Sequence, residues 1–587
     1  MIKYLIIGFL LSFSLACQSP NQEFRKITLE DYRSRMMAGW LGQMAGVGWG
    51  APTEFKYNSS TIPENQLPEW EQSMINQHFQ DDIYVEMTFL RTLEKYGFDV
   101  SNRQAGIDFA NTKYQLWHAN RSGRENLRLG IVPPYSGHPN FNVHFDDIDY
   151  QIEADFSGLI APGMPKMVYD LGQKFGRIMN YGDGLNGGIF IGSMYAAAFF
   201  ESDIHKIIQN GLLNIPPKSQ YAEAINDVIK WHEKFPDDWK KAWQLIESKY
   251  NLNKKYRKFS CNGNDENFNI DAKINGAYVV LGLLYGNGDM DQTITISILC
   301  GKDSDCNPSN AAGILATSKG INHLPKKYIS GIDQTTKFAF SSYDFPSLLS
   351  VCESLARIAV VKMGGKIKKN TKGEEEWLIS MSNHVITNLD ERLDTPILDE
   401  NVDIRFSSEE LRKITQKTRK PFEHITNWYV AGPFSNDSIG EGSIQKKTNI
   451  LELDSIDFCW SKMPIDWQNI SYDGIDLLSK FEVFNSYAYL RTGIWMPRDR
   501  VVIFEVGSDG KTKLWLNNNL VYQNNLSRVH VQGQDVLKVE LAKGWNKVLM
   551  QVGQGTLDWG VSLVITDTLQ NAIKIDKFKE IVTHHCD

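Results

Sequence analysis

The stretch Gly301–Gly320, GKDSDCNPSNAAGILATSKG, places two aspartates around one serine, directly ahead of small and apolar residues with helical spacing. A second pair of aspartates, in QDDIYVEM at residues 80–87, also begins an amphipathic helix. One aspartate is enough to cap a helix N-terminus and to interact favourably with its dipole. A second desolvated carboxylate is costly unless a cation compensates its charge. The pairs therefore indicate either capping with solvated charge or oxygen ligands for a hard divalent ion.

The chain around these pairs is predicted to be helical. Over residues 28–393 the apolar residues recur every three to four positions. In YVEMTFLRTLEKYG, Val85 and Leu93 share one face, and Gly97 is expected to end the helix. A segment rich in Pro, Gly and Asp, at residues 128–165, is predicted to be a long loop between helices. Loops on a helical scaffold often carry binding sites.

The last third of the chain has a different pattern, with short alternating strands separated by turns, as in VVIFEVGSDGKTKLWLNNNLVY at residues 501–522. Asp509-Gly510 predicts a hairpin turn, and residues 517–519 predict another turn. Strands at this spacing indicate an antiparallel sandwich. We therefore expect a multidomain chain with an all-α domain at residues 28–400, a linker at 401–424 and an all-β sandwich at 425–587. The segments GSDGKTKLWLNNNLVY and KGWNKVLMQVGQGTLDWG resemble the galactose-binding-like modules attached to extracellular carbohydrate enzymes. This resemblance implies a jelly-roll, carbohydrate-binding-like domain, and a sandwich that only packs on the helical domain is the alternative.

The N-terminus, MIKYLIIGFLLSFSLACQSP, has the layout of an export signal. The SLAC sequence predicts a lipoprotein signal peptide at residues 1–16, lipidation of Cys17 and a tether at residues 17–27; a general signal peptide with an incidental cysteine is the alternative. The apolar run is too short to span a membrane comfortably. We expect an exported protein on the outer membrane or cell surface, which contacts the membrane only through its lipid anchor.

The charge and the cysteine content argue against a nucleic-acid-binding protein, a disulfide-rich protein and a zinc site built from cysteines. A net charge of -8 without a long basic run gives no surface for a nucleic-acid backbone, so no nucleic-acid partner is expected. The cysteines after Cys17 fit no CxxC pattern and are few for an exported chain of 587 residues. They predict neither a disulfide framework nor a zinc site, although an isolated bridge stays open.

Three sequence blocks together resemble the ADP-ribosylglycohydrolase family in their order and separation. AGWLGQMAGVGWGAPTEF at residues 38–55 resembles the family's opening helix and its glycine-rich turn ending in glutamate. QDDIYVEMTFL at residues 80–90 resembles its Thr-Asp-Asp block, and residues 299–320 resemble its Gly-Gly-Asp-Thr-Asp-Thr block with the helix that follows. The resemblance implies an all-helical ADP-ribosylglycohydrolase-like domain with a metal site at the mouth of a cleft.

The resemblance also implies roles for individual residues. Metal ligands would be Asp81, Asp82, Asp303 and Asp305, with Gln80 as a further oxygen ligand, and Glu54 would be the catalytic glutamate. They would hold one or two divalent ions, magnesium, manganese or calcium.

Three positions depart from the family pattern. Gln80 and Cys306 stand where the family has threonine, and Val47 stands where it has aspartate. Because a thiol is a poor ligand for a hard ion, the metal centre is expected to be changed, with one ion, or none, in place of two.

Hydrolysis of a glycoside needs an acid near the leaving oxygen and a base or nucleophile on the other face. Besides Glu54, the acid-rich loop HFDDIDYQIEADF supplies Asp147 as the first choice for acid–base catalysis, followed by Glu153 and Asp155. The expected substrate-binding residues are Asp146, Asp149, Trp49 and Asn186. The alternatives are an acidic surface loop and a tryptophan that only packs in the core. Three histidines near this loop match no family motif and receive no role: His118, His138 and His144.

Three functions remain open. The first is an extracytoplasmic, metal-assisted glycoside hydrolase acting on a furanose-type or other terminal sugar, with a carbohydrate as its substrate. The second is an ADP-ribosyl-protein or ADP-ribose glycohydrolase. The third is a catalytically inactive sugar-binding lipoprotein, which the changes at positions 47, 80 and 306 would favour.

Overall fold

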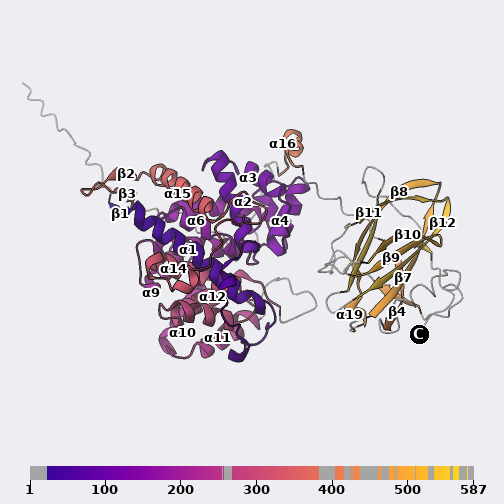
Figure 1. The fold of residues 1–587 in the computed structure, drawn as a ribbon, viewed down its shortest axis with the longest axis horizontal. Coiled ribbons are helices and arrows are strands. Elements are labelled where there is room, and N and C mark those ends of the chain that lie inside the picture. The colour runs from indigo at the N-terminus through magenta and orange to yellow at the C-terminus, as the bar shows by residue number, and fades with distance from the viewer. Residues whose placement is uncertain are drawn as a thin grey trace, which may run out of the picture. The chain divides into compact units, whose positions relative to one another are not determined.

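The computed structural model describes residues 23–253, 255–256, 268–381, 404–415, 425, 427–435, 460–464, 475–481, 483, 486–508, 510–525, 535–554, 559–566 and 578–579. The chain divides into two compact units, Met1–Lys417 and Thr418–Asp587 (Figure 1). The predicted signal peptide and Cys17 lie outside the described residues. No helix in the described ranges is both long and apolar enough to cross a bilayer.

The first unit is helical, as the sequence predicts. Its helices are α1 Leu29–Gly50, α2 Asp81–Tyr96, α3 Asn102–Ala110, α4 His118–Arg128, α5 Asp149–Ile152, α6 Asp155–Leu159, α7 Pro165–Phe175, α8 Gly182–Ala198, α9 Ile204–Leu212, α10 Gln220–Lys234, α11 Trp239–Ile246, α12 Ala272–Tyr285, α13 Met290–Leu299, α14 Cys306–Lys319, α15 Phe345–Lys362 and α16 Ser408–Lys413. Helix α2 ends before Gly97, which has a φ of 73°.

Helices α1, α8, α12 and α14 form the centre of this unit. Each buries nearly every side chain over most of its length. A helix surrounded by protein needs apolar or small residues on all sides, which explains why these helices lack a polar face. Helices α1 and α14, far apart in the sequence, lie side by side (Figure 1). This pair places the two halves of the site next to each other.

The structure differs from the predicted organisation at both ends of this unit. Strand β1, Phe24–Thr28, pairs with β3, Glu375–Ser380, which also pairs with β2, Lys366–Lys369. Part of the expected tether and part of the expected helical region thus form a small sheet. Part of the expected linker also belongs to this unit, because Glu410 of α16 forms an ion pair with Arg103 at 2.7 Å.

The segment 128–165 is also different from the loop that we expected. It contains α5 and α6, and five of its acidic residues are at most 3% exposed: Asp146, Asp147, Asp149, Glu153 and Asp155. The apolar residues that alternate with these acids anchor the segment, since Tyr150 and Phe156 are fully buried. An acidic surface loop is therefore excluded.

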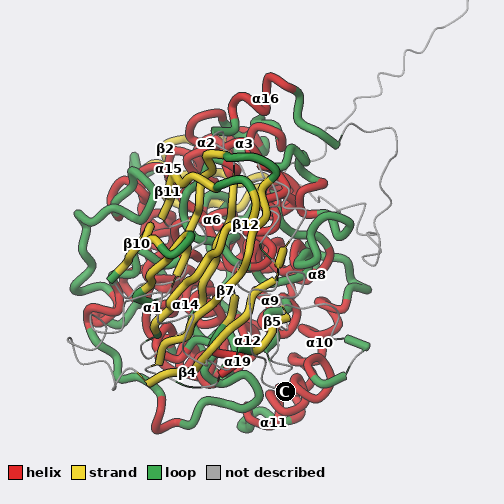
Figure 2. Tube along the Cα trace, turned by 90° about the vertical axis from the view of Figure 1, so that its right-hand side faces the viewer, coloured by secondary structure: helices red, strands yellow, loops and turns green. Residues whose placement is uncertain are grey.

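The second unit consists of antiparallel sheets, consistent with a jelly-roll module. Its elements are β4 Asn427–Ser435, β5 Ser461–Pro464, β6 Ile475–Asp476, α19 Leu478–Phe481, β7 Ser486–Met496, β8 Arg500–Ser508, β9 Thr512–Leu516, β10 Asn519–Asn524, β11 Asp535–Leu541, β12 Gly544–Gly553, β13 Gly560–Thr566 and β14 Phe578–Lys579. One sheet has the order β10-β9-β12-β7-β4-β5, with β14 on β7, and the other β11-β8-β13-β6. Figure 2 shows β7 and β12 running alongside each other.

One of the two predicted turns in this unit has another role. Asn517 and Asn518 adopt positive φ values and join β9 to its partner β10, as the sequence predicts. Gly510 does not close a hairpin, because β8 and β9 belong to different sheets. A Cβ at Gly510 would lie 2.0 Å from the Gly553 carbonyl oxygen, so glycine is needed where the chain crosses between sheets.

Candidate functional site

The first part of the site follows the C-terminal end of α1. Gly42, Gly46 and Gly50 lie one turn apart on one face of α1, and this face packs against α14 and the turn before it. A Cβ at Gly46 would lie 2.3 Å from the carbonyl oxygen of Pro308, and one at Gly50 would lie 1.9 Å from that of Ser304. Because only glycine allows the two backbones to approach so closely, the residues after Gly50 lie against the turn at residues 302–305.

Two contacts fix Glu54 beside this turn. The Oγ1 of Thr53 is 2.9 Å from the Oγ of Ser304, and the amide of Phe55 donates to the carbonyl oxygen of Lys302 at 2.9 Å. The neighbours of Glu54 on both sides are thus tied to the turn that carries the second aspartate pair.

The start of α2 brings the other aspartate pair to the same place. Gln80 is the N-cap of α2, and its side chain makes no capping hydrogen bond. Asp82 is fully buried, and the Sγ of Cys306 donates to its Oδ1 at 3.1 Å. The same sulfur lies 3.7 Å from the Oδ1 of Asp305. The thiol therefore joins the starts of α2 and α14.

We refer to Glu54, Asp81, Asp82, Asp303 and Asp305 as the carboxylate cluster. Glu54 lies at the exposed edge of the cluster, where partial desolvation, together with Asp305 and Asp81, raises the pKa of its carboxyl to about 8. Burial raises the pKa of Asp303 to about 8 as well. Burial and neighbouring carboxyls hold the pKa values of Asp82 and Asp305 well above their usual range. No member of the cluster forms an ion pair with Lys, Arg or His within the described part of the chain.

The cluster has the properties of a site for a hard divalent cation. The Oδ2 of Asp82 and the Oδ1 of Asp303 are buried and have no hydrogen-bond partner among the described residues. Ligand atoms of Asp303, Asp305 and Cys306 lie within 4.8 Å of one another. Uncompensated negative charge and unpartnered oxygens in a buried place are what a bound cation would neutralise. The carboxylates therefore fit such an ion, whereas the thiol does not.

Glu153 is the acid of the 128–165 segment that the structure brings to the cluster. Burial and the charge of Asp149 raise its pKa most, and Asp81 and Asp82 add to the effect. The side-chain amide of Asn120 donates to the Oε1 of Glu153 at 2.7 Å, whereas its Oε2 has no partner within the described chain. This oxygen is available to accept or hold a proton.

Three other predicted residues of this segment have different surroundings. Asp149 accepts the backbone N–H groups of Ala119 and Asn120 at the start of α4, at 3.1 and 3.0 Å. Asp147 lies 2.9 Å from the Nδ1 of His144. The pKa of Asp146 is raised by burial and Asp271. These contacts fix the segment to its neighbours.

A second set of buried acids lies behind the cluster. Asp155 accepts from the hydroxyl of Tyr195 at 2.6 Å and from the amide of Asn310 at 2.8 Å, and burial raises its pKa to about 8. Glu86, which was not among the residues predicted from the sequence, accepts from the side chain of Gln43 and from the amide of Phe156. Its position one turn after Asp82, on the buried face of α2, is the sequence feature that identifies it.

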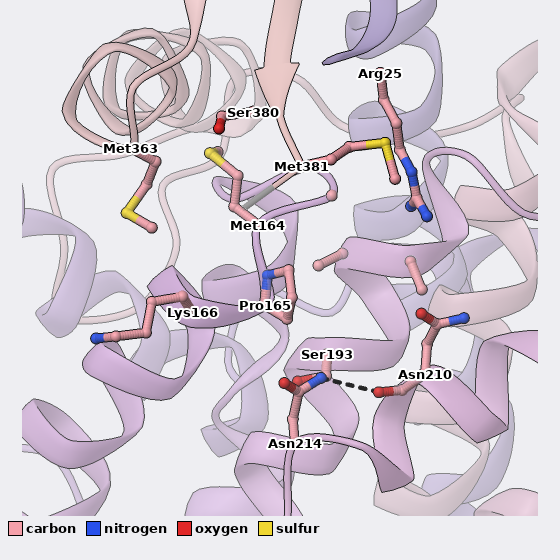
Figure 3. A pocket seen from close by; sticks show the side chains of 13 residues that line it. Arg25, Met164, Pro165, Lys166, Ser193, Asn210, Asn214, Met363, Ser380 and Met381 are labelled. Carbon is pink, nitrogen blue, oxygen red and sulfur yellow. Dashed lines mark hydrogen bonds between the residues drawn. The ribbon is translucent and has the colours of Figure 1, made fainter. Parts of the chain in front are cut away.

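Trp49 and Asn186 are both buried. The Nε1 of Trp49 donates to the Pro68 carbonyl oxygen at 2.7 Å, and its ring packs against Trp70. The Nδ2 of Asn186 has no partner among the described residues. A separate cavity of 170 Å³, lined by residues such as Arg25 and Ser193, contains none of the predicted site residues (Figure 3).

The fold and the carboxylate cluster define a helical domain with candidate metal-ligating groups. The profile of the ADP-ribosylglycohydrolase family matches residues 28–360, more than half of the chain, and the chain belongs to this family. As the family name states, its members hydrolyse glycosyl bonds. The resemblance inferred from the three sequence blocks is confirmed.

Solved structures give low similarities. An ADP-ribosylglycohydrolase-related protein complex aligns over 56% of this chain and 100% of its own, with 12% identity and a TM-score of 0.38. A β-glucosidase from Kluyveromyces marxianus in complex with glucose aligns over 24% of this chain and 15% of its own, with 15% identity and a TM-score of 0.17. A selenomethionine-labelled structure of the β-glucosidase from the same organism aligns over 46% of this chain and 34% of its own, with 10% identity and a TM-score of 0.18. No curated protein sequence matches the chain.

Replacement of Cys306 by Thr tests the departure from the family pattern. Burial and the surrounding carboxyls keep the pKa of the thiol well above its usual range, so it stays protonated and donates to Asp82. A threonine hydroxyl at this place would offer an oxygen ligand, and we expect about tenfold tighter Mn²⁺ binding in calorimetric titrations. Cys352→Ser, a change at a buried thiol on α15, is the control. Equal Mn²⁺ affinity of Cys306→Thr and the native chain would contradict this interpretation.

Proposed function

We propose that this chain is an exported, lipid-anchored glycoside hydrolase that uses a divalent cation and acts on a furanose-type or other terminal sugar of a glycan. The observation that carries the proposal is the position of Glu54: its exposed carboxyl, with a pKa of about 8, lies beside Asp81 and Asp305 of a cluster that no cationic side chain among the described residues neutralises. A hydrolase of glycosyl bonds needs such convergent carboxyls.

The cluster aspartates would hold one or two ions, magnesium, manganese or calcium. When bound, the cation supplies Lewis-acid activation and orients oxygen atoms of water or sugar. Glu54 can take or release a proton near neutral pH, which suits a general acid or base. Glu153, with its unpartnered oxygen near Asp81 and Asp82, is the second carboxyl that we assign to this reaction.

The proposed location rests on the N-terminal sequence. A signal peptide at residues 1–16 and a lipid on Cys17 would hold the protein at the outer membrane or cell surface through acyl chains alone. An exported enzyme encounters many glycans and little ADP-ribosylated protein, so location favours a carbohydrate substrate and a carbohydrate-binding role for the C-terminal sheets. The net charge of -8 supports the absence of a nucleic-acid partner.

A second candidate, an ADP-ribosyl hydrolase, is favoured by membership of the family. One assay separates the two candidate functions. The full chain, in the presence of Mg²⁺ or Mn²⁺, is given two kinds of substrate: a panel of furanosides and other terminal glycosides, and ADP-ribosylated protein. Release of free sugar that EDTA abolishes supports our proposal. Release of ADP-ribose without any glycoside hydrolysis would overturn it in favour of the second candidate. Glycan binding without turnover of either substrate would indicate an inactive sugar-binding protein.

A further inference from the structure

A second group of metal-ligating side chains lies outside the carboxylate cluster. His118, His144 and Asp147 each offer one ligand atom, and the three atoms lie within 4.8 Å of one another. The Nδ1 of His144 is 2.9 Å from the Oδ2 of Asp147, and the rings of His118 and His144 are 5.9 Å apart. Ligand atoms around a tetrahedral ion with bonds of about 2.1 Å are separated by about 3.4 Å. The three ligand atoms, all within 4.8 Å of one another, are therefore close to the spacing that such an ion requires.

Asp147 supplies an independent indication of a ligand. This side chain is 0% exposed, and its Oδ1 has no hydrogen-bond partner in the described ranges. A buried polar atom without a partner is costly and needs an explanation in a native structure. Burial raises the pKa of the carboxyl, and the charges of Asp149 and Asp271 add to this effect. A cation placed between Asp147 and the histidines would satisfy the oxygen.

Both histidines are partly buried. Burial lowers the pKa of His118 to about 3, and burial also lowers the pKa of His144. A neutral imidazole binds a divalent metal ion through the lone pair of one ring nitrogen. His118 has a φ of 41°, a left-handed backbone conformation that is uncommon for residues other than glycine. Strained backbone of this kind is often kept at functional sites.

We propose that His118, His144 and Asp147 form a second metal site, which takes a borderline divalent ion such as Zn²⁺. Two imidazoles and one carboxylate suit Zn²⁺, whereas the all-oxygen carboxylate cluster suits a hard ion. The cysteines predicted no zinc site, and none is a ligand of this one.

Three protein ligands leave a position of the ion open to an oxygen of water or substrate. Phe268 contacts the His118 ring and the Phe55 ring, at centroid distances of 5.8 and 4.9 Å. Phe55 and Phe268 pack with Cys306 in one apolar group. The two proposed metal sites therefore border the same apolar group, which contains Phe55 and Phe268.

The test uses Co²⁺ as the probe and the full chain. We expect the native protein to take up Co²⁺ with intense visible absorption, typical of low coordination numbers, which Zn²⁺ abolishes and a large excess of Mg²⁺ does not. His118→Ala with His144→Ala should remove the absorption and weaken Zn²⁺ binding at least a hundredfold. Asp303→Asn should keep the absorption, because it affects only the carboxylate cluster. His144→Gln, a smaller change, should by itself weaken Zn²⁺ binding at least tenfold.

The matched control is another histidine pair. The rings of His205 and His232 are 5.5 Å apart, and the structure places neither in a metal-ligating group of its described residues. His205→Ala with His232→Ala should leave both the absorption and the Zn²⁺ affinity unchanged. The proposal is overturned if the native chain shows no absorption, or if the absorption survives the loss of His118 and His144 in a protein with native circular dichroism.

Discussion

Glu54→Gln is expected to lower kcat/KM about a thousandfold while the fold and the metal affinity are kept. Glutamine has the same shape as glutamic acid but cannot take or release a proton, and removal of a positioned acid or base costs roughly two to four orders of magnitude. The raised pKa of Glu54, about 8, places this proton transfer near neutral pH. The measurement is kcat/KM on the substrate that the glycoside panel identifies, with Mn²⁺ binding followed by calorimetry.

The control for this variant is Glu64→Gln. Glu64 lies ten positions further along, is exposed, and pairs with Lys240 at 2.8 Å. An exposed ion pair contributes little, so this variant should keep both activity and stability. If Glu54→Gln retained activity within tenfold of the native chain, Glu54 would have no role in proton transfer and Glu153 would become the first choice.

The sequence predicted the helical unit and the aspartate pairs because both depend on local patterns. Helix periodicity and the stop at Gly97 depend on neighbouring residues, and the Asp81-Asp82 pair opens a helix whose first turn it occupies. The three blocks then indicated that distant segments meet. The site could be predicted to this extent because it is built from helix starts.

The remaining features depend on packing between distant segments, which periodicity does not report. The pairing of β1 with β3 joins residues more than 340 positions apart, such as Phe24 and Ser380. The burial of Asp147 and Asp149 follows from the packing of Ile148 between them and from the start of α4. The histidines at 118 and 144 are close in the sequence, but only the fold shows that they face each other beside a carboxylate.

Asp303→Asn is expected to weaken Mn²⁺ binding at least a hundredfold and to abolish metal-dependent hydrolysis. The variant removes a charged oxygen ligand whose Oδ1 has no other partner in the described chain. The asparagine amide can still hydrogen-bond Asp305, as the carboxyl does. Calorimetric titration with Mn²⁺ measures the loss. Asp237→Asn, at an exposed aspartate of the same unit, is the control and should bind Mn²⁺ as the native chain does.

Without metal, the same substitution should stabilise the helical unit as the pH rises. The pKa of Asp303 is raised from 3.8 to about 8 in the folded state, so the carboxyl's contribution to stability is fully present below about pH 4 and is lost as the pH rises through 8. Asparagine does not titrate. At about 1.4 kcal/mol per pKa unit, the variant gains at most about 6 kcal/mol over the native chain between pH 4 and pH 8.

Thermal unfolding in EDTA should therefore give Asp303→Asn the higher Tm at pH 8, with a difference that shrinks towards pH 4. Added Mn²⁺ should raise the Tm of the native chain at pH 8 and leave the variant unchanged, because only the native cluster gains a cation that compensates its ionised carboxyls. A native chain that melts above the variant in EDTA at pH 8 would mean that a cationic group outside the described residues already neutralises the cluster. In that case the buried aspartates would form a structural ion network, and the metal assignment would be wrong.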